Sequence, residues 1–282
     1  MQEHFENMRF LYGNDVYVQI PNDIFKLLSS HIKNRNGSTN IQQSSFAYAY
    51  IVIVSILYKY AHFVGIDNNT YIQNADIKEL LGYSKTTKSI DAVIKKGGLL
   101  DEIGLTTTTK DYPIRFDYDT EEKINEVAIR QFTTISELGT GNTLLEKIRG
   151  IVKNRNYEVK EPKFLFEYND GNGTLYDYSN THRVTLEEVL AFIKEENLDN
   201  IDFSIYCFLK SKCKGYHNDS QAIGLQKIIS QLGIGKDAFY SHLERLKMFD
   251  FIEVNHKGWV MGANENLESN IYRFKGLSKK VL

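Results

Sequence analysis

The chain has 282 residues and a formal net charge of −2, with 42% hydrophobic and 25% charged residues. This length suits two domains of ordinary size, and the composition excludes a disordered or collagen-like chain. The near-neutral charge excludes a uniformly basic protein, so any surface for nucleic acid must be a local patch that acidic residues offset elsewhere.

The N-terminal part alternates extended and helical patterns. Val16 to Ile20 alternates like a strand, and Pro21 with Asp23 opens a short helix. Residues 46–58 are apolar and rich in tyrosine, and this run is shorter than a membrane span, so it predicts a buried core helix. The first residues mix acid and base without the apolar stretch of a signal peptide, so secretion is not expected.

A helix, a tight turn and a second helix are predicted between residues 74 and 98. The first helix ends at Gly82, and Ser84 caps the second, which has one apolar face and one basic, hydroxyl-rich face. Residues 105–110 and 114–118 are extended on either side of a turn, which predicts a hairpin.

The remaining chain repeats this order after a connection. A glycine-rich break in residues 119–163 marks the domain connection. Alternating runs then predict a hairpin of Phe164 to Tyr168 with Thr174 to Tyr178. Later patterns predict helices and a last hairpin, over residues 185–193, 202–214, 225–232 and 236–249, and then 252–255 with 259–261. The expected domains are residues 1–122 and 163–282, joined by a connecting segment of residues 123–162.

Cysteine usage indicates a cytoplasmic protein without a metal site. Cys207 and Cys213 fall on different faces of one expected helix, so they cannot form a disulfide within it. Without disulfides, a reducing cytosol is the expected compartment. His217 adds a third metal-binding side chain nearby, but no fourth ligand stands at zinc-finger spacing.

Two segments carry a resemblance to a known family. Residues 232–254, LGIGKDAFYSHLERLKMFDFIEV, resemble the recognition helix and first wing strand of bacterial winged-helix DNA-binding proteins, with Asp250 where these often have glycine. Residues 80–100, LLGYSKTTKSIDAVIKKGGLL, resemble the same motif with a longer turn. The resemblance implies a helix-rich α+β fold of two tandem winged-helix domains, each a helix-turn-helix with a β-hairpin wing.

The resemblance also implies that an outward helix face of each domain enters the major groove of double-stranded DNA. Cations there would neutralise phosphates, and hydroxyl groups would contact phosphates or base edges. The candidate DNA-binding residues are Lys85, Thr86, Thr87, Lys88, Ser89, Lys95, Lys96 and Lys110 in the first domain, and Lys236, Tyr240, Ser241, Arg245, His256 and Lys257 in the second. Two alternatives remain open, which are a merely solvated helix face and a winged helix that binds a protein partner.

The functional hypothesis is a sequence-specific transcription regulator. The strand followed by Ile20 and Pro21 is similar to the N-terminal winged helix of Gram-positive plasmid replication initiators, so a plasmid or phage initiator that binds origin repeats is the alternative. Expected partners are double-stranded DNA, a second copy in a homodimer, and host transcription or replication proteins, with no membrane. The sequence has no P-loop, dinucleotide fingerprint or His-Glu zinc helix, so no enzymatic activity, cofactor or metal is expected.

Overall fold

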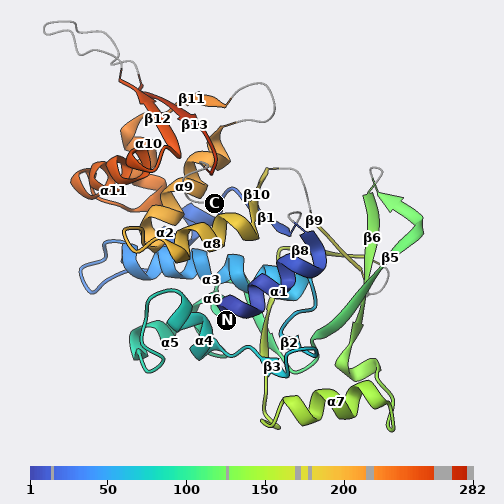
Figure 1. The fold of residues 1–282 in the computed structure, drawn as a ribbon. Coiled ribbons are helices and arrows are strands. Elements are labelled where there is room, and N and C mark those ends of the chain that lie inside the picture. The colour runs from blue at the N-terminus through green and yellow to red at the C-terminus, as the bar shows by residue number, and fades with distance from the viewer. Residues whose placement is uncertain are drawn as a thin grey trace, which may run out of the picture. The chain divides into compact units, whose positions relative to one another are not determined.

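A computed structural model describes residues 1–13, 16–124, 127–168, 173–176, 180–213, 219–256 and 269–277 of a mixed α+β protein (Figure 1). The chain divides into two compact units. Unit 1 is Met1–Ile20 with Tyr50–Glu187, and unit 2 is Pro21–Ala49 with Glu188–Leu282.

This division differs from the contiguous domains that the sequence predicts. Residues 21–49 belong with the C-terminal part, because their apolar and polar side chains find partners there. Phe25 packs edge-on against Phe208, with ring centroids 5.4 Å apart, and the Ser29 hydroxyl donates to the Gln231 carbonyl at 2.9 Å. Periodicity shows that a helix has a buried face, but it does not show which distant helix covers that face.

The longest helix is the predicted core helix. It spans Ile41–Lys59, and the boundary between the units falls within it, after Ala49. By length and composition alone it would pass for a membrane span, with a mean hydropathy of 1.3, but 83% of the stretch is buried inside the protein. Its apolar character therefore follows from its place in the core.

Unit 1 contains short helices and several small sheets. Its helices are α1 (Gln2–Tyr12), the second part of α3 (Ile41–Lys59), α4 (Asn74–Leu80), α5 (Lys88–Ile94), α6 (Leu99–Glu102) and α7 (Thr143–Ile151), with a 3-10 turn at Ile135–Glu137. Its strands are β1 (Tyr17–Pro21), β2 (Val64–Gly65), β3 (Thr70–Tyr71), β4 (Thr106–Thr109), β5 (Pro113–Ile124), β6 (Val127–Thr134), β7 (Val159–Pro162), β8 (Leu165–Tyr168), β9 (Gly173–Tyr176) and β10 (Thr181–Thr185). The sheets are β1-β10, β2-β3, β4-β7 and β5-β6-β9-β8.

The hairpin predicted for residues 105–118 is wrong. β4 pairs antiparallel with β7, with Thr109 opposite Val159, whereas β5 pairs with β6 in the long hairpin of Figure 1. The Asp111 carboxylate accepts hydrogen bonds from the backbone N–H and the hydroxyl of Ser136, at 2.9 and 2.7 Å. Because these bonds tie the end of β4 to the segment that follows β6, the chain enters β5 without folding back on β4.

The hairpin predicted around residues 169–173 is confirmed, but it belongs to unit 1. β8 pairs with β9, and β9 also pairs with β6, with Gln131 opposite Gly173. This second pairing places the hairpin in the β5-β6-β9-β8 sheet of unit 1. The expected start of the C-terminal domain at residue 163 is therefore too early.

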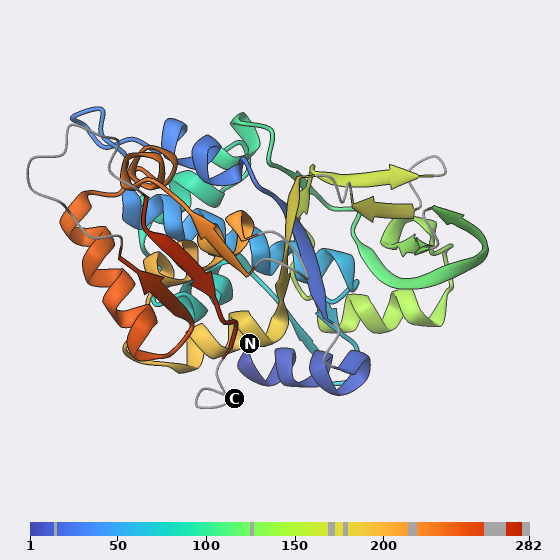
Figure 2. The same ribbon diagram turned by 90° about the horizontal axis from the view of Figure 1, so that it is seen from above.

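Unit 2 contains a succession of helices and one small sheet, whose first strand lies between two of the helices in the chain (Figures 1 and 2). Its helices are α2 (Ile24–His31), the first part of α3, α8 (Leu186–Lys194), α9 (Asn200–Lys212), α10 (Leu225–Leu232) and α11 (Lys236–Met248). Its strands are β11 (Ser220–Ala222), β12 (Ile252–Asn255) and β13 (Ile271–Phe274), in the order β11-β13-β12. The predicted positions of α10, α11 and β12 are confirmed, while the expected partner strand, residues 259–261, lies outside the described residues.

Candidate nucleic-acid interface

α11 has the inward and outward faces that its spacing predicts. Phe239, Leu243 and Leu246 are fully buried, whereas Lys236 and Ser241 are exposed. Tyr240 is half-buried and packs against the ring of Phe239. The start of α11 thus presents an ammonium group, a phenol and a hydroxyl on one side of the helix.

The turn before α11 is narrowly constrained. Gly233 ends α10 in the left-handed conformation, with φ of 66°. A Cβ atom at this position would lie 2.2 Å from the Thr39 hydroxyl oxygen, so there is no room for a side chain. Gly235 caps α11 with an ordinary φ of −71° and open space around it. Backbone geometry and close packing both require glycine at position 233.

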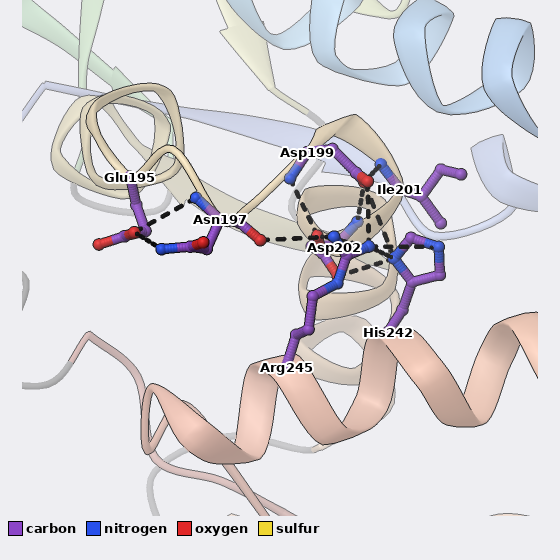
Figure 3. A network of polar contacts seen from close by, with 7 residues as sticks. All are labelled: Glu195, Asn197, Asp199, Ile201, Asp202, His242 and Arg245. Atoms are coloured by element: carbon purple, nitrogen blue, oxygen red, sulfur yellow. Dashed lines mark hydrogen bonds and ion pairs between the residues drawn. The ribbon is translucent and has the colours of Figure 1, made fainter.

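A buried polar cluster joins α11 to the start of α9 (Figure 3). Asp202 is fully buried and lies 2.8 Å from His242 Nδ1 and 3.1 Å from Arg245 Nη2. Arg245 Nη2 also donates to Asp199 at 3.0 Å and contacts the His242 ring. The sequence assigns Arg245 to the groove face, but its guanidinium group is committed to this cluster.

The two carboxylates of the cluster differ in their electrostatic environment. Burial raises the pKa of Asp202 above its ordinary value, and the nearby charge of Asp199 acts in the same direction. Burial also acts to raise the pKa of Asp199, but the Asp202 N–H, His242 and Arg245 outweigh it, so the pKa of Asp199 lies below its ordinary value. The half-exposed Asp199 is thus the more firmly ionised of the two acids.

The cluster also has the composition of a metal site. One ligand atom each from Asp199, Asp202 and His242 lies within 4.8 Å of the others. However, Arg245 forms ion pairs with both carboxylates, at 3.0 and 3.1 Å, and so supplies the positive charge that a cation would bring. The arrangement fits a structural ion-pair network that sets the position of α11 on α9.

In unit 1, one buried lysine links the corresponding pair of helices. Lys78 of α4 is 2% exposed, and its Nζ donates to Asp91 of α5 at 2.7 Å and to the Thr87 carbonyl at 3.4 Å. α5 begins at Lys88, later than the Ser84 cap predicted from the sequence, because the backbone is still extended at Thr87. Lys85 and Thr86 therefore lie in the turn.

The lysines predicted to contact DNA in unit 1 fall into two groups. Lys85 forms an ion pair with Glu79 at 3.1 Å, and this contact raises its pKa, while Lys96 forms one with Glu158 at 2.7 Å. Lys88 and Lys95 are exposed and form no ion pair with any residue that the structure describes. Acidic neighbours thus offset part of the predicted basic face.

The other predicted residues lie at or near the surface where they are described. Lys110 is exposed and donates to Asn156 at 3.3 Å. Thr86, Ser89 and His256 are exposed and Thr87 is half-buried, while Lys257 lies outside the described residues.

Sequence reasoning missed a basic loop. Residues 153–156, Lys-Asn-Arg-Asn, are all exposed and lead into β7, whose partner is β4. This pairing brings the loop beside Lys110, through the contact with Asn156. The short basic run was visible in the sequence, but its proximity to Lys110 depends on the β4-β7 pairing.

No family model matches the chain, and neither a curated protein nor a solved structure matches it.

Proposed function

We propose that this chain is a sequence-specific double-stranded DNA-binding protein that acts as a transcription regulator. The order of helices and strands in unit 2 is the observation that supports this proposal. α9, β11, α10, α11, β12 and β13 follow one another, with the strands arranged β11-β13-β12. This order resembles that of a winged helix, in which the helix after the turn enters the major groove and the hairpin flanks it.

The exposed side of α11 has suitable chemistry for this role. Lys236 can neutralise a phosphate, and Ser241 and the Tyr240 hydroxyl can donate to phosphates or accept and donate at base edges. His256 lies just beyond β12, where a wing would meet the DNA backbone. The glycine turn and the buried cluster around Asp202 hold this helix in a defined orientation within unit 2.

Unit 1 supports a second, tandem reader. It has α3, α4, α5 and the antiparallel pair β4-β7 in chain order, with residues 113–151 inserted between the paired strands. Lys88 and Ser89, at the start of α5, and Lys95, directly after it, are exposed. Their contacts with DNA would add to those of α11.

The test is binding of the purified chain to duplex fragments from its own locus, over a range of salt concentrations. The variant changes Lys236→Ala, Tyr240→Phe and Ser241→Ala together, and Lys194→Ala on α8 is the control with the same change in charge. We expect one fragment to bind tightly, the control to behave like the wild type, and the triple variant to lose about 10-fold or more in affinity. Equal affinities for the triple variant and the control would refute a role of α11 in binding DNA.

The position of the bound fragment decides between the two roles. An operator upstream of an operon supports a regulator, whereas repeated sites inside or beside the gene support a replication initiator. Absence of any specific fragment would favour a winged helix that binds a protein partner.

A further inference from the structure

A pocket of about 260 Å³ lies in unit 1, between the start of α4, strand β4 and the segment that leads into β7. Its polar walls consist mainly of side-chain amides and ammonium groups. The walls include the side chains of Asn74, Asn154, Asn156, Lys96 and Lys160.

The three asparagines offer donors to the pocket. The Oδ1 of Asn74 accepts from the Tyr50 hydroxyl at 2.5 Å, that of Asn154 from the Asn156 N–H at 2.9 Å, and that of Asn156 from Lys110 Nζ at 3.3 Å. Because each oxygen is already used, the NH₂ groups remain, and none of them has a partner among the described residues. Each amide oxygen already accepts one hydrogen bond within the protein, so the amides offer the pocket their unused N–H donors.

The ammonium groups of Lys96 and Lys160 also bring hydrogen-bond donors and positive charge to the pocket. Lys160 is 2% exposed, and its Nζ donates to the Lys95 carbonyl at 2.9 Å and to Asp101 at 2.6 Å, which leaves a third N–H. Lys96 pairs with Glu158, the acidic residue of the pocket wall, at 2.7 Å. Burial acts to raise the pKa of Asp101, but hydrogen bonds from Lys160, Thr106 and the Gly97 N–H lower it below its ordinary value. The carboxylates of Asp101 and Glu158 are thus each neutralised by a lysine.

Further cations neighbour the lining residues. Lys95 is exposed beside Lys96 in the chain, Lys110 is exposed and donates to Asn156, and Lys153 and Arg155 alternate with the two asparagines of the loop. The surroundings are therefore positive, while the pocket itself is rich in donors.

We propose that this pocket binds a phosphate group, either from a DNA backbone or from a free phosphate or nucleotide. A phosphate offers acceptor oxygens and negative charge, which matches the unused amide donors of the pocket and the cations beside its lining residues. The inference that the phosphate belongs to a DNA backbone rests on the proposed function. The inference that it belongs to a free phosphate or nucleotide does not.

The test replaces Asn154→Asp and Asn156→Asp together. Aspartate has the shape of asparagine and keeps the oxygen that each residue uses within the protein, so the change removes the NH₂ donors and adds one negative charge at each position. The control carries Asn34→Asp and Asn142→Asp, which add the same charge at exposed sites whose Oδ1 also accepts backbone N–H groups. Asn74→Asp is a second pocket variant, in case the first one unfolds.

Calorimetric titration with inorganic phosphate and with adenosine monophosphate, at fixed ionic strength, provides the first readout. We expect the wild type and the control to bind alike and the pocket variants to bind about 10-fold more weakly or worse. The second readout is affinity for duplex DNA as a function of salt. If the phosphate belongs to DNA, the pocket variants also lose DNA affinity, and their salt dependence becomes shallower by about one phosphate contact.

The outcomes separate the two proposals. Loss of phosphate binding with unchanged DNA binding identifies a free phosphate ligand, and a loss of DNA affinity identifies the backbone. If the wild-type protein binds phosphate but no DNA, the proposed function is refuted and the proposal of a phosphate site still holds. Pocket variants that match the control in both readouts would overturn the phosphate site.

Discussion

The two helix pairs, α4-α5 in unit 1 and α10-α11 in unit 2, follow the same order in the chain but are held in different ways. In unit 2 a fully buried carboxylate, Asp202, holds α11 through two side chains, and the turn before α11 requires glycine at position 233. In unit 1 the link is one lysine, Lys78, whose partner Asp91 is 47% exposed. α11 is therefore the more firmly oriented helix, and α5 the more adaptable one.

The strands that follow these helices differ as well. In unit 2, β12 pairs with β13 beside β11. In unit 1, β4 finds its partner only after residues 113–151 have formed a separate hairpin and helix. The insertion brings the basic loop of residues 153–156 to the end of β4, so unit 1 gains a basic surface beside this strand.

The largest expected effect is on the anchor of α11. Asp202→Ala leaves His242 and Arg245 without their buried partner and should lower the free energy of unfolding by about 3–5 kcal/mol. Urea denaturation measures the loss, and hydrogen exchange should show it in α9 and α11. Asp237→Ala, at an exposed site in the first turn of α11, is the control and should change stability little. A loss below about 1 kcal/mol for Asp202→Ala would show that the cluster does not anchor the helix.

The turns give a direct comparison of the two units. Gly233→Ala should cost about 2–3 kcal/mol, because a left-handed backbone and a clash with Thr39 act together. Gly82→Ala in the turn of unit 1, where φ is 79° and the space is open, should cost only about 1 kcal/mol from backbone strain. Thermal unfolding of both variants measures the difference, and equal losses would contradict the tighter packing of the turn in unit 2.

Unit 1 should be the more sensitive to acid. Burial, with His4 nearby, lowers the pKa of His62 to about 3 from an ordinary value of 6.5. Because the unfolded chain binds this proton more readily, the stability contributed by neutral His62 is present above about pH 6.5 and is lost as the pH falls toward 3. At pH 5 the loss should be about 2 kcal/mol relative to pH 7.

Urea denaturation at pH 7 and pH 5, with hydrogen exchange to separate the units, measures this effect. The His62→Gln variant should be less stable at pH 7 and should show a flatter pH dependence. A variant with the same pH dependence as the wild type would assign the acid sensitivity to other groups.

The smallest effect on the free energy of unfolding is expected at the ion pair of Lys78 and Asp91 in unit 1. Lys78→Met keeps the aliphatic packing and leaves Asp91 in contact with water, so it should cost about 1 kcal/mol. Urea denaturation measures the loss, and Lys147→Met on the exposed side of α7 is the control. A loss as large as that of Asp202→Ala would show that the two anchors are equivalent.

Sequence reasoning identified the elements whose signals are local. α10, α11 and β12 lie where their patterns predict, because apolar residues at helical spacing and glycines at the turn are properties of a short segment. The β8-β9 hairpin is confirmed for the same reason. Its assignment to a unit failed, since that depends on the pairing with β6.

The candidate site was predicted less completely. The exposed positions of Lys88, Ser89, Lys236 and Ser241 agree with their helical spacing. Arg245 was placed on the outward face, but it reaches back to Asp199 and Asp202, because a long side chain at the edge of a helix can turn toward a buried acid.

The sequence by itself determined the local elements and the alternation of apolar and polar faces, since both depend on residues a few positions apart. Only the tertiary structure decided that residues 21–49 join the C-terminal unit, that β4 pairs with β7, and that three asparagines and two lysines from distant segments line one pocket. These features depend on contacts between residues far apart in the chain, where packing and charge pairing select one partner among many that the local pattern allows.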